Sequence, residues 1–112
     1  MEILDLDALI DEHLELAYSA HSGRSSCTLA GGREHDLRQT LIVLAGGNAL
    51  HEHDSPGEAT LQVLRGEATF TAGDGALAMS AGDFLVIPPI RHGLEAVTDC
   101  AVVLTVATRG ER

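Results

Sequence analysis

The chain contains no lysine and no tryptophan, and it has only three aromatic residues, Tyr18, Phe70 and Phe84, among its 112 positions. Hydrophobic residues nevertheless make up 45% of the sequence, so the core must consist mainly of Leu, Val, Ile and Ala. No stretch approaches the roughly 18 continuous apolar residues that a membrane-spanning helix requires. These absences exclude a membrane helix and predict an aliphatic core.

Positive charge is also scarce. All seven basic residues are Arg, and they stand against 17 acidic residues, which gives a formal net charge of −10 and a pI near 4.8. Nucleic acids and anionic membrane surfaces bind to basic faces, so the balance disfavours both as partners. A small-molecule ligand is still expected, because one local Arg can outweigh the overall field.

Only two cysteines are present, Cys27 and Cys100, and they are too far apart in sequence to form a metal or redox motif. We expect two free, mostly buried thiols in a reducing cytosol, although the sequence leaves a disulfide between them open. The first residues, 1–11, are acidic rather than basic, which argues against a signal peptide. The sequence therefore predicts a soluble cytoplasmic protein.

The length fits one domain spanning 1–112, with a helix and loop over 1–22 and a β region over 27–107. Asp5 is the expected helix cap, and polar residues from Ser19 to Ser26, with Gly23 among them, are expected to end the helix. Apolar residues recur at helical spacing between these limits. They are Leu6, Leu9, Ile10, Leu14 and Ala17.

From Cys27 onward, short apolar runs alternate with Gly, Pro and Asp, which is typical of an all-β domain. Turns are expected at Gly46-Gly47-Asn48, Ser55-Pro56-Gly57 and Gly73-Asp74-Gly75, and Pro88-Pro89 should end a strand. Two of the runs, 41–45 and 101–106, are apolar on both faces, as in a closed barrel or a sandwich. The predicted strands are 27–30, 37–45, 49–53, 59–65, 67–72, 76–79, 83–87, 93–97 and 101–107.

Six histidines are present, and two of them form the pattern His51-Glu52-His53 in a predicted strand. Alternate side chains of a strand point to one face, so two imidazoles could together provide the first ligands of a transition-metal site. Alone, the pattern would also fit two exposed hairpin histidines. His13 and His21 are expected to be solvated, and His35 is expected at the surface near a strand end.

The residues around these histidines form two linked motifs. In the first, Gly46 precedes His51-Glu52-His53, and Glu58 then leads into Val63-Leu64-Arg65-Gly66-Glu67. In the second, Gly82-Asp83 leads through Ile87-Pro88-Pro89 to His92. Together, over about residues 41 to 107, they resemble the signature motifs of the cupin superfamily. The resemblance implies an antiparallel, jelly-roll β-barrel preceded here by a short N-terminal helix.

The resemblance also implies a divalent metal inside the barrel, held by His51, His53 and His92. The family's glutamate ligand has two alternatives here: Glu58 follows His53 at a suitable distance, whereas counting back from Gly66 places Ala59 at that position. The second motif is one residue shorter than the family pattern, because it lacks the glycine between the prolines and the histidine. The ligand types are compatible with Fe, Mn, Ni, Zn or Cu.

Two functions compete. One is a metal-dependent enzyme, a dioxygenase or an isomerase or lyase, acting on a small molecule that polar side chains orient. The other is a non-enzymatic module that senses or stores a small ligand at a degraded metal site. A third alternative is a purely structural dimer module, since small cupins commonly pair through their sheets, and we expect a homodimer. The expected substrate-binding residues are Arg38, Gln39, Gln62 and Arg91.

Overall fold

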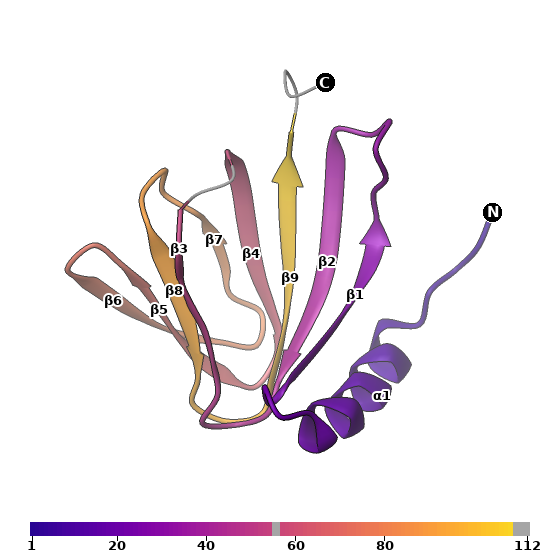
Figure 1. The fold of residues 1–112 in the computed structure, drawn as a ribbon, viewed down its shortest axis with the longest axis horizontal. Coiled ribbons are helices and arrows are strands. Elements are labelled where there is room, and N and C mark those ends of the chain that lie inside the picture. The colour runs from indigo at the N-terminus through magenta and orange to yellow at the C-terminus, as the bar shows by residue number, and fades with distance from the viewer. Residues whose placement is uncertain (55–56, 109–112) are drawn as a thin grey trace.

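The computed structural model describes residues 1–54 and 57–108, which form two antiparallel sheets and one helix that packs on the first of them (Figure 1). The first sheet has the strand order β1-β2-β9-β4-β7, and the second has the order β3-β8-β5-β6. The elements are α1 (Leu6–Ser19), β1 (Arg24–Ala30), β2 (Leu37–Leu44), β3 (Ala49–His53), β4 (Glu58–Arg65), β5 (Glu67–Ala72), β6 (Gly75–Ser80), β7 (Phe84–Val86), β8 (His92–Ala96) and β9 (Cys100–Ala107).

The helix and every predicted strand are confirmed, with small differences at their ends. The largest difference is in β1, which begins at Arg24 instead of Cys27. Its first three residues are all polar, so the sequence shows no alternation there. Asp5 caps α1 as expected, its side chain accepting a hydrogen bond from the Ala8 N–H at 3.1 Å. The predicted turn at Ser55-Pro56-Gly57 lies partly outside the described residues.

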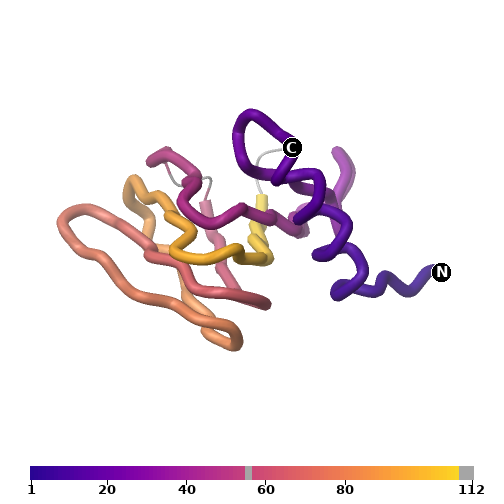
Figure 2. The backbone as a smooth tube through the Cα atoms, turned by 90° about the horizontal axis from the view of Figure 1, so that it is seen from below, coloured from indigo at the N-terminus to yellow at the C-terminus, as the bar shows by residue number. Residues whose placement is uncertain are grey.

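The helix α1 covers the outer face of the first sheet (Figure 2). Ile10 packs there with Leu41 and Val43 of β2 and with Ala101 and Val103 of β9. This contact explains why the runs 41–45 and 101–106 are apolar on both faces, since one face lines the sandwich and the other lies under the helix. The two-sided pattern therefore arises from the helix and does not require a closed barrel.

Polar contacts fix the helix in place. Arg65 at the end of β4 forms an ion pair with Asp11 at 2.7 Å and a longer one with Asp7 at 3.8 Å. His13, expected to be solvated, is half-buried instead, because its Nδ1 lies 2.6 Å from the hydroxyl of Ser25 on β1. These contacts hold α1 against both β1 and β4.

The end of α1 is joined to the turn between β8 and β9. The Tyr18 hydroxyl donates a hydrogen bond to the Asp99 carboxylate, which also accepts the Gly46 N–H at 2.8 Å. The bond from Tyr18, followed by that from Gly46, lowers the pKa of Asp99 below its ordinary value. A lowered pKa means that this carboxylate stabilises the fold above the unfolded-state pKa, and that the contribution is lost on acidification.

The sandwich interior is aliphatic, as the composition predicts, and is filled by Leu44, Leu61, Val63, Val102 and their neighbours. Within the described residues no strand pair joins the two sheets, so the barrel is an open sandwich. The strand β7, at one of the unjoined edges, has only three residues and is followed by Pro88 and Pro89, which lack N–H donors. The sheets diverge toward the upper end in Figure 1, where β3 ends and β8 begins.

Both cysteines are free thiols, Cys27 half-buried and Cys100 buried. Burial, and next the charge of Asp99, raises the pKa of Cys100 to about 11, while burial and then Glu12 raise the pKa of Cys27. At pH 8 only roughly one Cys100 thiol in a thousand is then ionised, and the thiolate is the reactive form.

We therefore expect a disulfide reagent at pH 8 to modify Cys27 in the native protein well before Cys100, and both thiols at similar rates in urea. Absorbance of the released thiolate measures the two phases. Cys27→Ser should remove the fast phase and Cys100→Ser the slow one. Equal native rates for the two thiols would contradict the assignment.

Among the described residues, no helix has both the length and the apolar character needed to cross a bilayer.

Candidate functional site

Two of the predicted ligands, His53 and His92, lie together at the upper end of the second sheet. They are directly opposite each other in the β3–β8 pair, and their ring centroids are 4.6 Å apart with the planes inclined at 62°. His92 is only 4% exposed, whereas His53 is open to solvent. One ring of the pair is therefore buried in the sandwich, and the other lies at its solvent-exposed edge.

The hydrogen bonds of this pair define the tautomer of each neutral ring. His53 Nδ1 lies 3.1 Å from the carbonyl oxygen of His51, and His92 Nδ1 lies 2.9 Å from that of Ile90. A carbonyl oxygen can only accept, so each Nδ1 carries the hydrogen and donates it. In the neutral rings, each Nε2 then keeps its lone pair, which is how metal-binding histidines are commonly prepared.

A β-bulge places His53 on the inner face. Leu50 is opposite Leu94 and His53 is opposite His92, so the chain advances three residues along β3 but only two along β8. Leu50 and His53 would face opposite sides of a regular strand, but the extra residue brings both toward the interior. The bulge falls within His51-Glu52-His53, where the sequence predicts regular alternation.

His51 lies in the bulge and is exposed. It lines a shallow pocket of about 410 Å³ together with Arg24, Leu50, Glu52 and His53. Over residues 1–54 and 57–108, no three His, Cys, Asp or Glu side chains are grouped so as to hold a metal ion. The structure thus brings His53 and His92 together without gathering His51 to them.

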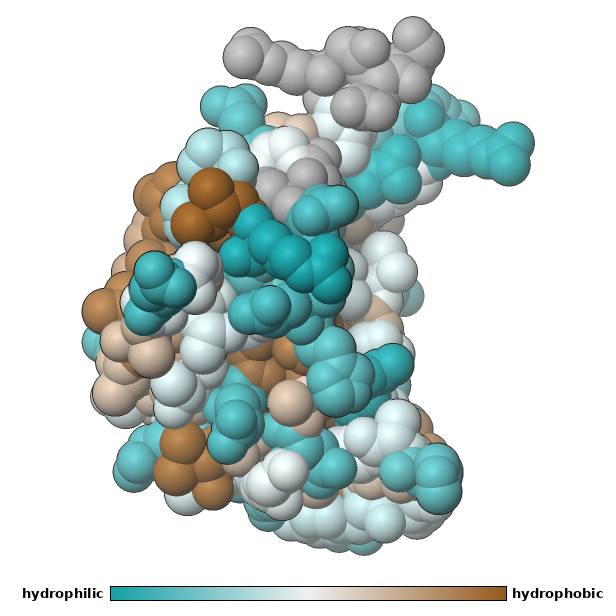
Figure 3. All heavy atoms as spheres, turned by 60° about the vertical axis from the view of Figure 1, so that its left-hand side comes forward, coloured by the Kyte–Doolittle hydropathy of each residue, from teal (hydrophilic) through white to brown (hydrophobic). Residues whose placement is uncertain are grey.

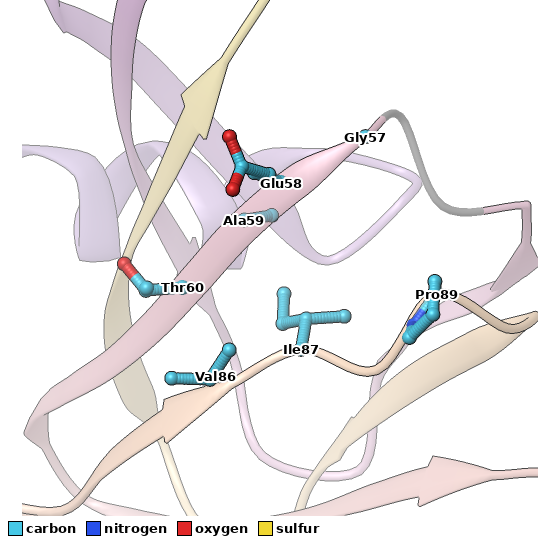
Figure 4. A pocket seen from close by; sticks show the side chains of 7 residues that line it. All are labelled: Gly57, Glu58, Ala59, Thr60, Val86, Ile87 and Pro89. Carbon is cyan, nitrogen blue, oxygen red and sulfur yellow. The ribbon is translucent and has the colours of Figure 1, made fainter.

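The two candidate positions for the fourth ligand, Glu58 and Ala59, lie on opposite faces of β4. Ala59 is buried and faces the interior with Leu61 and Val63, whereas Glu58 is exposed on the outer face. Ile87, the residue directly after β7, faces the same interior as Ala59. In Figure 4 the Glu58 carboxylate points away from Ile87. Both residues border a pocket of about 550 Å³, which is also lined by Gly57, Thr60, Val86, Ile87 and Pro89.

Of the expected substrate-binding residues, Arg38 alone belongs to the inner face. It lies near the start of β2, opposite Val106, a residue of the interior cluster. Arg38 is exposed, and its side chain makes no hydrogen bond or ion pair with residues 1–54 or 57–108. An exposed arginine at this position could bind an anionic group.

The other three lie outside the sandwich. Gln39 donates a hydrogen bond to the Thr105 hydroxyl at 3.2 Å, and Gln62 is exposed on the outer face of β4. Arg91 donates to the Glu52 carbonyl oxygen at 3.0 Å and forms ion pairs with Glu52 and Asp54. The Arg91 side chain is therefore engaged in contacts with the end of β3. His21 and His35 are exposed, as expected.

Sequence reasoning missed Phe70. Its ring stacks on His92 with centroids 5.7 Å apart and an inclination of 23°, and it is 3% exposed. Phe70 also lines an apolar groove of about 460 Å³, together with residues that include Leu77, Leu85 and Pro88. One signal was available: Phe70 is one of three aromatics and sits in mid-strand.

Solved structures support the fold. A conserved protein of unknown function from Streptococcus pyogenes is 27% identical, with a TM-score of 0.71 over 95% of this chain and 86% of that one. An RmlC-like cupin from Desulfovibrio desulfuricans is 28% identical, with a TM-score of 0.67 over 76% and 82%. Salicylate 1,2-dioxygenase from Pseudaminobacter salicylatoxidans is only 16% identical, with a TM-score of 0.75 over 89% of this chain and 33% of that one.

The comparison with curated proteins gave no match. The family model described as "Cupin domain" matches residues 40–108, which is more than half of the chain and includes both histidine motifs. The fold and the family model agree with the resemblance in the sequence. The chain belongs to the cupin family.

Proposed function

We propose that this cupin binds a divalent transition metal through the Nε2 atoms of His53 and His92, with His51 as a third ligand, and binds a small molecule beside it. The observation that carries the proposal is the pair of Nδ1–H bonds to backbone carbonyls, which leaves both Nε2 lone pairs available. Imidazole ligands suit Fe, Ni, Cu and Zn.

The donor set fits a metal in part. The two prepared imidazoles are suited to it, whereas the nearby acids Glu52 and Asp54 are already paired with Arg91. Ala59 supplies no donor at the inward position of β4. The site would therefore have few protein ligands, and we expect binding that is weaker and more exchangeable than in a closed four-ligand site.

The chain's own residues favour a small anionic ligand. Arg38 offers a positive charge at the open end of the sandwich, and the surrounding walls are aliphatic. A bound metal would supply a Lewis acid for a carboxylate or carbonyl oxygen. The dioxygenase, isomerase and lyase alternatives all require that metal, so metal binding is the property to test first.

The test is a titration of untagged protein with Zn(II) or Ni(II), followed by calorimetry. We expect about one metal per chain, and His53→Ala or His92→Ala should weaken binding by roughly a hundredfold or more, because even outer-shell changes cost 10–100-fold. His51→Ala tests the third ligand. Binding should also weaken on acidification, because protons compete with the metal for imidazole.

His21→Ala is the matched control, since it removes an exposed histidine away from the pair, and Glu58→Ala tests the outer-face carboxylate. Neither should change the affinity. Unchanged affinity in both His53→Ala and His92→Ala, or no binding by the wild-type protein between pH 7 and 8, would overturn the metal proposal.

A second function, metal-free binding of a small carboxylate, is favoured by Ala59 at the inward position and by the ungrouped His51. It predicts that small carboxylates raise the melting temperature in the presence of a chelator, and that Arg38→Gln removes this effect. A thermal shift that appears only with added metal would exclude it.

A further inference from the structure

The two sheets separate along the β6 side of the sandwich. Leu77 of β6 is directly opposite Phe70 of β5, so both side chains lie on the same face of the second sheet. Phe70 is buried and belongs to the interior cluster, so this is the inner face. Leu77 is nevertheless 55% exposed, whereas Met79, two residues further along the same face, is 6% exposed. The interior is therefore covered at Met79 and open at Leu77.

This opening is the groove of about 460 Å³, and it has one wall from each sheet. The β5–β6 hairpin contributes the wall that includes Phe70 and Leu77, and β7 with the residues after it contributes the wall that includes Leu85, Val86 and Pro88. Within residues 1–54 and 57–108, no strand pair joins these walls. The volume falls within the range of about 300–1,000 Å³ that is usual for small-molecule pockets. A small molecule seated here would contact both sheets.

The lining of the groove is apolar. None of the described residues that line it has a side chain that carries a charge or forms hydrogen bonds. Asp74 precedes the lining residue Gly75, and the chain has a net charge of −10, so an anion would be repelled. A polar ligand group would lose water here without gaining a side-chain partner. These features select an uncharged, apolar ligand.

Much of this apolar lining is in contact with water. Val86 is 68% exposed, which is more than Leu77 on the opposite wall. Figure 3 has the β6 side of the molecule turned forward, with apolar surface gathered toward its left margin. Removing apolar surface from water is favourable, so an apolar ligand would be held by covering these side chains.

Phe70 connects the groove to the histidine pair. Its ring lines the groove, and it also stacks on His92 with the ring centroids 5.7 Å apart. His92 is not among the described residues that line the groove. A molecule packed against Phe70 would therefore change the surroundings of the His92 ring without touching it.

We infer that this groove binds a small, uncharged molecule with an apolar ring, packed against Phe70 and Leu77 on one wall and Leu85 and Val86 on the other. A ring is favoured because aromatic rings pack on a phenyl ring by offset stacking or edge to face. The site is separate from the proposed metal ligands, and its only link to them is the contact between Phe70 and His92.

The test is a titration in the presence of a chelator, so its result does not depend on the proposed metal. The probe is 2-naphthol, which is uncharged at neutral pH, and 2-naphthoate is the anionic counterpart with the same rings. We expect saturable binding of 2-naphthol by calorimetry, with a dissociation constant below about 1 mM. Binding of 2-naphthoate should be at least about tenfold weaker, because its carboxylate has no partner in the groove.

Nuclear magnetic resonance of the histidine rings checks the position of the probe. The ring-proton signals of His92 should move as 2-naphthol binds, because Phe70 stacks on this ring. The signals of His21, an exposed residue in the turn after α1, should stay where they are. The signal missing from His92→Ala identifies His92.

Leu77→Gln and Val86→Gln place an amide on opposite walls, at exposed positions that the fold should tolerate. Each should weaken 2-naphthol binding by about fivefold or more. Val97→Gln is the matched control, since Val97 is 56% exposed, directly follows β8 and does not line the groove. Circular dichroism confirms that each variant is folded.

Four results would each overturn the inference. They are the absence of saturable 2-naphthol binding to the wild-type protein, equal affinity for the two probes, unchanged affinity in both groove variants, and His92 signals that do not move. None of them bears on the metal titration, which is done without chelator and without the probe.

Discussion

Replacing Phe70 with alanine is expected to lower the free energy of unfolding by about 3–5 kcal/mol, the usual cost of deleting a buried phenyl ring. Phe70 is 3% exposed, and its ring joins the interior cluster to the face of His92. Domains of this size are stable by only about 5–15 kcal/mol. The loss should therefore bring the protein close to its unfolding threshold, as urea denaturation would show.

Phe70→Leu is the control, because leucine keeps most of the apolar volume and loses only the stacked ring. We expect it to recover more than half of the stability lost in Phe70→Ala. If the two variants were equally stable, the ring would not pack as the structure shows. Metal titration of Phe70→Leu then isolates the effect of stacking on His92 from the effect of the cavity.

Much of the fold could be predicted from the sequence because it depends on local patterns. Gly, Pro and Asp mark the turns, alternating apolar residues mark the strands, and Asp5 marks the helix start. The open sandwich could not be predicted in this way. The two-sided apolar runs are equally consistent with a barrel, and the two are distinguished by strand pairing, because no pair joins the two sheets within the described residues.

The site was less accessible to prediction for a related reason. A bulge depends on the register of two strands, and nothing within His51-Glu52-His53 shows that β8 opposes these three residues with only two. The position of Ala59 was more accessible. Its alternation with the buried Leu61 and Val63 is visible in the sequence and indicates that it, rather than Glu58, faces inward.

The bulge itself depends on Gly93. A Cβ built on this buried glycine would lie 3.1 Å from the Leu50 carbonyl oxygen and 3.3 Å from the backbone nitrogen of Glu52. These backbone atoms belong to the bulged part of β3, so they can move only if the strand moves. Glycine at position 93 thus permits β3 to approach closely enough to place His53 opposite His92.

We therefore expect Gly93→Ala to destabilise the protein by about 3 kcal/mol, at the upper end of the usual cost of overpacking, since the clash is with backbone. Gly75→Ala is the matched control. Its Cβ would meet only an ordinary contact at 3.4 Å, and its φ is not positive, so stability should be unchanged or slightly higher. Chemical denaturation of the two variants measures the difference.

A second measurement separates a role in positioning from one in stability alone. If Gly93 sets the register, the folded Gly93→Ala variant should lose contacts between the His53 and His92 rings in nuclear Overhauser spectra. It should also bind Zn(II) at least about tenfold more weakly, as for other changes behind a metal ligand. Wild-type ring contacts and wild-type affinity in a destabilised variant would show that Gly93 contributes only packing. Loss of the ring contacts would identify Gly93 as the residue that aligns the pair.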